Sequence, residues 1–270
     1  MSISTFTSYR TKQDAPWQTI TFTKNALTTG TNNVTATQWY TAPDASTTSP
    51  SAAACDSATD GADHLALKNA SSTMRIGRLS IGNGFAAHNT WILVDRLSCT
   101  FGLGGTVTSA QTVNTTALTR YTDGVGVCAL LEVSQLIGTS QMTYTTTFTG
   151  VVGGASSTSV AQIIGGANRR NAGFVAWTPL PAGERGVLSV QDLTLSGSTG
   201  TAGEFGVVLV KPLLIVPVHY SGQAIHVDPL LIAGVLPQIQ DSACLQWICL
   251  AGSASNTTGT LNAELTIIAE

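Results

Sequence analysis

The fold class of this chain is read most directly from WILVDRL, residues 91–97. A short apolar run bounded by polar residues is typical of a strand that is buried in a sheet. Side chains of an extended chain alternate between two faces. One face carries Ile92, Val94 and Arg96, and the other carries Trp91, Leu93, Asp95 and Leu97. Both faces are mainly apolar, so at least one of the two charges must lie near an apolar layer or its rim.

Strand patterns of this kind recur on both sides of WILVDRL, separated by turns rich in Gly, Ser and Asn. Further strands are predicted at 17–22, 74–81, 125–133, 141–149, 187–195, 204–210, 213–218, 244–251 and 260–268. Helical patterns are limited to 160–167 and 229–235, each long enough for one or two turns. Many short strands at spacings of ~8–12 residues predict an all-β fold, an antiparallel β-sandwich of the jelly-roll type.

The N-terminal part of the chain differs in composition from the rest. Residues 41–63 are rich in Ser, Ala and Thr and show no periodicity, which is typical of a long loop or an arm. We therefore divide the chain into an arm with a strand extension, residues 1–75, and a β-sandwich domain, residues 76–270. Residues 1–63 are predicted to reach a neighbouring subunit, and deleting residues 1–40 is predicted to leave a folded sandwich.

The chain carries little charge for its size. Only 10% of its 270 residues are charged, against ~25% in a typical soluble domain. Hydrophobic residues make up 43%, which argues against intrinsic disorder. Its 12 Lys and Arg residues are spread over the chain, so no nucleic-acid partner is expected. Because charge repulsion helps to keep proteins apart, we predict a homodimer or homotrimer, or stability only within a larger assembly.

No targeting or membrane-spanning segment is predicted. Residues 1–10 are polar and lack the apolar core of a secretory signal. The most apolar stretch is GVVLVKPLLIVPVHY, residues 206–220, which Lys211, Pro212 and Pro217 interrupt. A membrane helix needs ~20 apolar residues without such breaks. The stretch is better explained as two buried strands with Pro at their ends or at an edge, and no membrane partner is expected.

The cysteines suggest neither a zinc site nor a fixed disulfide framework. There are five, with no CxxC pair, at positions Cys55, Cys99, Cys128, Cys244 and Cys249. The histidines, His64, His88, His219 and His226, do not group with them. Small buried apolar side chains are therefore the expected role of the cysteines. A disulfide remains open if the protein matures outside a reducing cytosol.

No catalytic or cofactor-binding motif is found. GxSxG, HExxH, GxxxxGK[ST] and SxxK are all absent. Asp56, Asp60 and Asp63 share one loop, but their spacing is not that of a calcium loop. We therefore predict no enzymatic activity, no metal and no cofactor.

Four charged residues are the candidates for structural or inter-subunit contacts. Asp95 and Arg96 lie inside an apolar run, and buried charges are normally paired. We expect a bridge from one of them to another strand or to a neighbouring subunit. Arg169 and Arg170 form a basic spot in a polar loop. They are either part of a solvated turn or a contact to an acidic surface of a partner.

Three stretches carry a resemblance to a known group of proteins. The first is LVDRLSCTFGLGGTVTSAQTVNTTALTRYTDGVGVCALLEV, residues 93–133. The second is GERGVLSVQDLTLSGSTGTAGEFGVVLVKPL, residues 183–213, with RGVLSVQDLTLS as its core. The third is the Thr-rich strand at 139–153. Together these stretches, which span residues 91 to 215, resemble a group of structural proteins from the virions of tailed bacteriophages.

The resemblance implies a non-enzymatic virion component that assembles in the host cytoplasm. A cement or decoration protein is the first expectation, bound to the major capsid protein or to other virion proteins. A tail or fibre component is the nearest structural alternative. The alternative from another class is a carbohydrate- or receptor-binding β-sandwich module, which would stack sugars on exposed aromatic rings.

Overall fold

The computed structural model describes residues 6–24, 35–40, 53–59, 62, 73–84, 88–219, 222–234, 236–252 and 260–269. Its strand pairings are all antiparallel, and its helices are α1 (Phe6–Asp14) and α2 (Pro229–Ala233). The prediction of an all-β, sandwich-like antiparallel fold is confirmed. Within the described ranges, no helix has both the length and the apolar character needed to cross a membrane.

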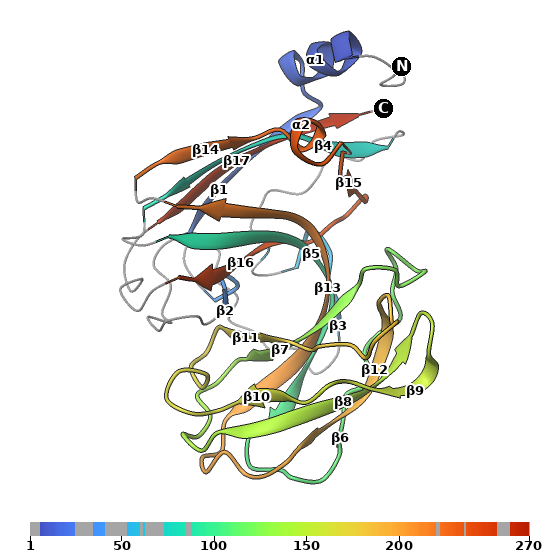
Figure 1. Ribbon diagram of the computed structural model, residues 1–270, viewed down its shortest axis with the longest axis vertical. Coiled ribbons are helices and arrows are strands. Elements are labelled where there is room, and N and C mark those ends of the chain that lie inside the picture. Colours follow the sequence, from blue (N-terminus) through green and yellow to red (C-terminus); the bar gives the residue numbers. More distant parts are fainter. Residues whose placement is uncertain are drawn as a thin grey trace.

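The strands form three sheets that follow one another along the long axis of the molecule (Figure 1). The upper sheet contains β1 (Gln18–Lys24), β17 (Leu261–Ala269), β4 (Met74–Asn83), β14 (Ala224–Val227) and β15 (Gln238–Ile239). The middle sheet contains β13 (Glu204–Val218), β7 (Cys128–Val133), β11 (Phe174–Trp177), β2 (Thr35–Thr37), β16 (Leu245–Ala251), β5 (Asn89–Gly104) and β3 (Ala53–Ala54). The lower sheet contains β10 (Gln162–Ile164), β8 (Met142–Gly150), β12 (Val187–Leu195), β6 (Gln111–Thr112) and β9 (Gly154–Thr158).

The middle sheet closes on itself. Its strands are hydrogen-bonded in the order β13, β7, β11, β2, β16 and β5, and β5 pairs again with β13. We call this closed set the ring; β3 lies beside it, paired to β5 at Cys99 and Ser98. Closure removes the exposed edges that an open sheet would present. The ring interior is therefore a separate compartment of the protein.

Three apolar cores correspond to these layers. The first lies between the upper sheet and the ring and includes Phe22, Trp91 and Trp247. The second lies between the ring and the lower sheet and includes Phe148 and Phe205. The third fills the ring itself, and its buried members are Trp39, Cys55, Ala62, Ile92, Val94, Cys99, Phe101, Leu130, Val175, Val208, Val210, Cys244 and Ile248.

WILVDRL lies in β5, and its two faces are buried in different cores. Ile92 and Val94 point into the ring, whereas Trp91 and Leu93 pack against the upper sheet. The strand β5 contributes side chains to the cores of both halves of the molecule, because it is long and pairs with β13 from residue 89 to residue 104. Register shifts interrupt that pairing, one of them between Arg96 and Ser98, and bulges of this kind bend strands. Figure 1 shows β5 and β13 curving together from the upper half into the lower half.

The described parts of the N-terminal segment pair with strands of their own chain, and contact of this segment with a neighbouring subunit stays a prediction. β1 pairs with β17 along its full length, from Gln18 opposite Ile267 to Lys24 opposite Leu261. β2 bridges β11 and β16 and so completes the ring. The physical reason is the alternation in β1, which gives it a buried apolar face that packs into the first core. Residues 41–52, 60–61 and 63 lie outside the described residues.

Some predicted elements differ from the structure. The helical turn predicted at 229–235 is present as α2, where Asp228 accepts hydrogen bonds from the amides of Leu230 and Leu231. The turn predicted at 160–167 is wrong, because β10 lies there and pairs with β8. The two strands predicted at 204–210 and 213–218 are one strand, β13, which accommodates Pro212 at an irregularity of its pairing.

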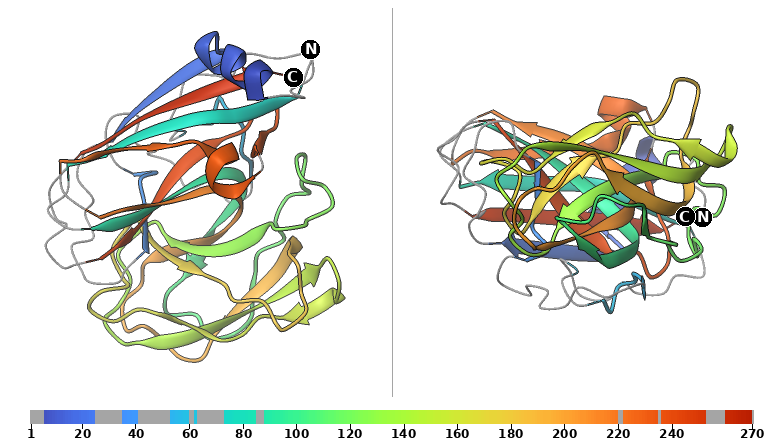
Figure 2. Two further views of the ribbon diagram at one scale, coloured as in Figure 1. Left: turned by 45° about the horizontal axis from the view of Figure 1, so that its top comes forward. Right: turned by 90° about the horizontal axis from the view of Figure 1, so that it is seen from below.

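Helix α1 was not predicted, because its sequence is polar and lacks an apolar stripe. Two of its side chains nevertheless fix it to the upper sheet, and the left view of Figure 2 shows the helix beside the strands of that sheet. The Tyr9 hydroxyl donates to the Gly77 carbonyl at 2.7 Å and lies 2.6 Å from the Asp228 carboxylate. The Gln13 amide donates to the same Gly77 carbonyl at 2.8 Å. Polar contacts to residues far away in the sequence therefore stabilise this helix, whose own sequence has no apolar stripe to hold it against the sheet.

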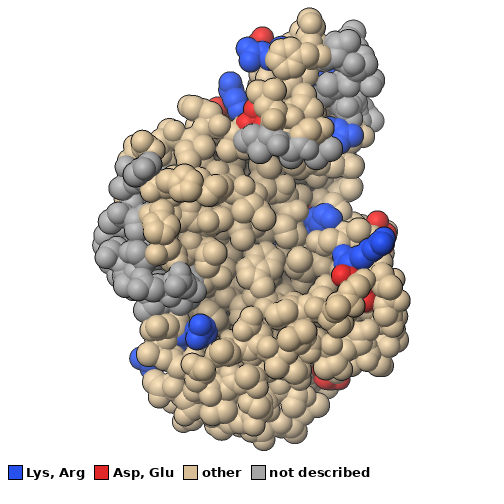
Figure 3. All heavy atoms as spheres, in the orientation of Figure 1, with Lys and Arg blue, Asp and Glu red and all other residues tan. Residues whose placement is uncertain are grey.

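The surface of the described chain is even poorer in charge than the composition indicates. Five charged side chains are buried, namely Lys24, Asp95, Arg96, Arg120 and Glu132. Large apolar side chains are exposed on all three layers, and they include Phe6, Trp17, Val152, Val160, Ile215, Leu231 and Leu250. Figure 3 shows one face of the molecule, on which charged side chains are few and scattered.

One exposed carboxylate supplies a test of stability against pH. Glu184 accepts hydrogen bonds from the amides of Val152 and Gly153, at 2.9 and 2.8 Å, in the turn between β8 and β9. These bonds lower the pKa of Glu184 to about 2, and the bond from the Gly153 amide contributes most to this shift. A lowered pKa means that the stabilisation is complete above the unfolded pKa of ~4.3 and is lost as the pH falls towards 2.

We therefore expect Glu184→Gln to lower the melting temperature (Tm) at pH 7 by a few degrees at most and to have no effect near pH 2. Thermal unfolding of both proteins between pH 2 and pH 7 measures the difference. Glu264→Gln is the matched control, because Glu264 meets Arg78 only at 3.9 Å on the surface. A Glu184→Gln effect that is equal at pH 3 and pH 7 would contradict the assignment.

Candidate functional site

The first part of the site is an ion pair inside the ring. Arg96, on β5, donates to Glu132, on β7, at 2.8 Å, and the two side chains are 0% and 1% exposed. A second guanidinium nitrogen lies 3.4 Å from the other carboxylate oxygen, so the pair is bidentate. Burial alone would disfavour the charged guanidinium. The Glu132 carboxylate and the neighbouring thiol and phenol groups together outweigh this effect, and the pKa of Arg96 is raised well above its usual value.

Aromatic and amide groups complete the surroundings of Arg96. Its guanidinium carbon lies 4.0 Å from the centre of the Trp39 ring, a distance at which a cation and an aromatic face attract each other. Gln246, on β16, accepts from Arg96 at 3.4 Å and donates to the Thr37 hydroxyl. The contacts thus join β5, β7 and β16 to residues of the N-terminal segment. Arg96 holds the interior of the ring together.

The second part of the site is another buried ion pair on the opposite face of β5. Arg120 donates to both carboxylate oxygens of Asp95, at 2.7 and 2.9 Å. The amide of Cys244 also donates to this carboxylate, at 2.9 Å. Burial raises the pKa of Asp95, while Arg120 and the Cys244 amide act against that rise. Arg120 further donates to the backbone carbonyls of Cys55 and Arg96, at 2.9 and 3.0 Å.

Arg96 pairs with Glu132 on the strand β7, and Asp95 pairs with Arg120 in a loop of the same chain. The partners themselves could not be identified from the sequence. Glu132 did carry a signal, since it is a lone charge in the apolar run VGVCALLEV, residues 125–133. Arg120 carried none, because it lies in a polar loop where a charge needs no partner. Trp39 lies just before residues 41–63, which have no strand pattern.

Arg169 and Arg170 take no part in the two ion pairs. They occupy the loop between β10 and β11, where their backbone carbonyls accept from Gly165 and Ile137, at 3.2 and 3.0 Å. Both side chains are half-buried. No hydrogen bond or ion pair within the described ranges connects this loop to Asp95 or Arg96. A contact of these arginines with a partner therefore stays a prediction.

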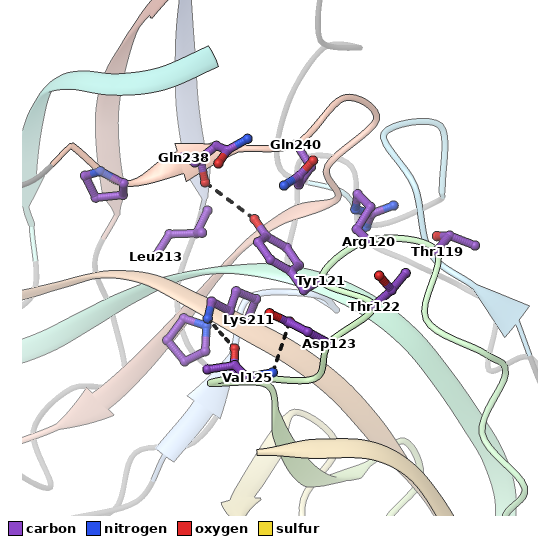
Figure 4. A pocket seen from close by; sticks show the side chains of 12 residues that line it. Thr119, Arg120, Tyr121, Thr122, Asp123, Val125, Lys211, Leu213, Gln238 and Gln240 are labelled. Carbon is purple, nitrogen blue, oxygen red and sulfur yellow. Dashed lines mark hydrogen bonds between the residues drawn. The ribbon is translucent and has the colours of Figure 1, made fainter. Parts of the chain in front are cut away.

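The third part of the site is a surface cleft of about 620 Å³ beside the Arg120 loop. Figure 4 shows the side chains that converge on it from the loop, from β13 and from β15. Its lining is mostly polar and consists of Thr119, Arg120, Tyr121, Thr122, Asp123, Val125, Lys211, Pro212, Leu213, Pro237, Gln238 and Gln240. Arg120 therefore both pairs with the buried Asp95 through its guanidinium and forms part of the lining of the cleft.

Tyr121 is the centre of the cleft and is held in an uncommon conformation. Its backbone φ is 51°, in the left-handed region that bulky residues rarely adopt. Its hydroxyl lies 3.5 Å from the Gln238 carbonyl. Lys211 lies 5.5 Å from the ring centre and donates to the Val125 carbonyl at 2.6 Å. Burial raises the pKa of Tyr121, so its phenol is neutral at physiological pH.

The cleft offers hydroxyl, amide and carboxylate groups and one ammonium, which suit hydrogen bonding to a polar ligand. One face of the Tyr121 ring is covered by Lys211, which leaves at most the other face for stacking on a sugar. No cluster of three or more His, Cys, Asp or Glu side chains in the described part of the chain is arranged to hold a metal ion. Asp60, Asp63 and His64 lie outside the described residues.

Comparisons with known proteins place the chain in no family. No family model matches it, and no curated protein matches it. Among solved structures, a subviral particle of VP2 from infectious bursal disease virus matches with 8% identity and a TM-score of 0.20, over 94% of this chain and 80% of that one. A structure of T=1 particles derived from infectious bursal virus matches with 11% identity and a TM-score of 0.22, over 93% of this chain and 77% of that one. Similarities with TM-scores and identities this low support no conclusion about the fold or function of this chain.

Proposed function

We propose that this chain is a non-enzymatic structural protein of a virus particle, and more narrowly a cement or decoration protein that stabilises a shell through contacts between subunits. The narrower role follows the resemblance of residues 93–133 and 183–213 to structural proteins of tailed-phage virions. The observation that carries the proposal is the surface of the folded chain.

That surface combines missing charge with exposed apolar side chains. Lys24 and the four members of the two ion pairs are buried, which removes five charges from a chain that already has few. Ile215 and Leu231 are 64% and 70% exposed, on β13 and on α2. Low charge gives little protection against association, and a partner that covered Ile215 and Leu231 would remove their apolar surface from water. Burial between subunits satisfies both features.

The buried site supports a structural role. Its two ion pairs tie β5, β7 and the Arg120 loop together, and neither pair opens onto the cleft as a free acid or base. The alternative function, saccharide binding, would use the cleft around Tyr121. We place it second, because Tyr121 is the one aromatic residue among the described residues that line the cleft, and Lys211 covers one face of its ring.

We expect the purified full chain to be an oligomer at micromolar concentration, measured by analytical ultracentrifugation. Replacing Ile215 and Leu231 by Lys should weaken that association and leave the Tm unchanged. Electron microscopy separates the narrower roles: closed particles formed by the chain alone indicate a shell protein, whereas small oligomers that bind preformed shells indicate a decoration protein. A monodisperse monomer that binds glycans and no shell would overturn the proposal.

A further inference from the structure

The ring interior holds a pair of thiols that no other feature of the site explains. Cys55 follows β3 and Cys99 lies on β5, and their Sγ atoms are 3.6 Å apart. Both residues belong to the third core, with exposures of 0% and 1%. Forty-four positions of sequence separate the two sulfurs.

The backbone on both sides of the pair is already fixed. The amide of Cys55 donates to the Leu97 carbonyl at 3.0 Å, and Ala53 lies opposite Cys99 in the β3–β5 pairing. Arg120 holds the Cys55 carbonyl at 2.9 Å. A disulfide has an S–S distance of about 2.05 Å, so a further approach of roughly 1.5 Å is required. Side-chain rotation with a small movement of β3 can supply it.

We propose that Cys55 and Cys99 are a modification site, where mild oxidation forms a disulfide that joins the N-terminal segment covalently to the ring. The link would close a loop that contains β4 of the upper sheet and would fix β3 to β5. It would form in the isolated protein whether or not the chain belongs to a particle.

The electrostatic surroundings favour Cys99 as the thiol that reacts first. Cys55 donates its S–H to the sulfur of Cys99, and this hydrogen bond lowers the pKa of Cys99 and raises that of Cys55. The buried guanidinium of Arg96 lowers the pKa of Cys99 further. A thiolate next to a cation, with a second thiol in contact, is the arrangement found at reactive cysteine pairs.

A small peroxide is the oxidant that fits a buried pair. The Cys99 thiolate attacks one oxygen of hydrogen peroxide, the O–O bond breaks, and the hydroxide that leaves takes up the proton released by Cys99. The sulfur of Cys55 then attacks the sulfenic acid on Cys99, and hydroxide leaves with the proton of Cys55 as water. Two thiols and one peroxide give one disulfide and two waters. Local opening of the two-residue strand β3 gives the peroxide access.

The test uses the purified full chain, treated either with hydrogen peroxide or with a reducing agent, then blocked with an alkylating reagent and digested with trypsin. Trypsin should release Cys55 in peptide 25–68 and Cys99 in peptide 97–120, each with no other cysteine. We expect these two peptides to be joined after oxidation, with the mass of two hydrogens lost. The oxidised protein should melt about 5–10 °C higher than the reduced protein.

Variants distinguish this pair from general thiol oxidation. Cys99→Ala should remove both the cross-link and the difference in Tm, whereas Cys249→Ala, at a buried thiol of the first core, should keep both. Cys55→Ala should leave a sulfenic acid on Cys99 that dimedone captures. Wild-type protein that keeps five free thiols in peroxide, or that joins Cys99 to Cys244 instead, would overturn the proposal, and neither result depends on the folding of a variant.

Discussion

Deleting residues 1–40 is expected to abolish cooperative folding, in contrast to the expectation from sequence that a folded sandwich remains. The deletion removes α1, β1 and β2 together with Trp39. Loss of β2 opens the ring between β11 and β16, and loss of β1 leaves one edge of β17 without its partner. Exposed strand edges of this kind promote aggregation.

The size of the effect follows from the side chains that are lost. Ile20 and Phe22 are buried in the first core, and Trp39 is buried in the ring beside Arg96. Truncating a single large core side chain costs about 2–5 kcal/mol, and a whole domain is stable by only about 5–15 kcal/mol. Removing all three, with their strands, exceeds that margin.

Thermal unfolding followed by circular dichroism, with the soluble fraction on expression, measures this prediction. Two double variants of β1 separate the effect of its buried face from that of its exposed face. Ile20→Ala with Phe22→Ala should be strongly destabilised, whereas Thr19→Ala with Thr21→Ala, on the exposed face of the same strand, should melt within a few degrees of wild type. A soluble truncated protein that melts cooperatively near the wild-type temperature would contradict this prediction and support the arm hypothesis.

Replacing Arg96 by Met is expected to lower the free energy of unfolding by about 3–5 kcal/mol, because it leaves the Glu132 carboxylate buried without its cation. The variant also loses the contact between the guanidinium and the Trp39 ring. Replacing both partners avoids the unpaired charge. We therefore expect Arg96→Met with Glu132→Leu to recover a large part of the loss.

Urea unfolding, followed by tryptophan fluorescence, gives these free energies. Arg78→Met is the matched control, since Arg78 and Glu264 form a pair at 3.9 Å with side chains about half exposed. An exposed pair of this kind contributes no more than about 1 kcal/mol. Equal stabilities of the Arg78→Met and Arg96→Met proteins would show that water reaches the Arg96 pair, and a double variant no better than Arg96→Met would exclude an unpaired charge as the cause.

Most of the strands were predictable, because alternation is a local property of the sequence. The pattern at 187–195 predicted β12 to the residue, and the strand predicted at 141–149 is present as β8, with Tyr144, Thr146 and Phe148 on its buried face. The division of WILVDRL into two faces was also correct. Helix α1 could not be predicted, because it is stabilised by bonds from Tyr9 and Gln13 to Gly77, more than sixty residues away.

The sequence by itself determined an all-β chain, a strand at WILVDRL buried on both faces, and two charges that require partners. Only the tertiary structure decided which partners they have, that the middle sheet closes into a ring, and that Cys55 lies against Cys99. The physical reason is range. Alternation acts between neighbouring residues, whereas Arg96 and Glu132 are 36 positions apart and meet only through the register of β5, β13 and β7, which the packing of all three cores sets together.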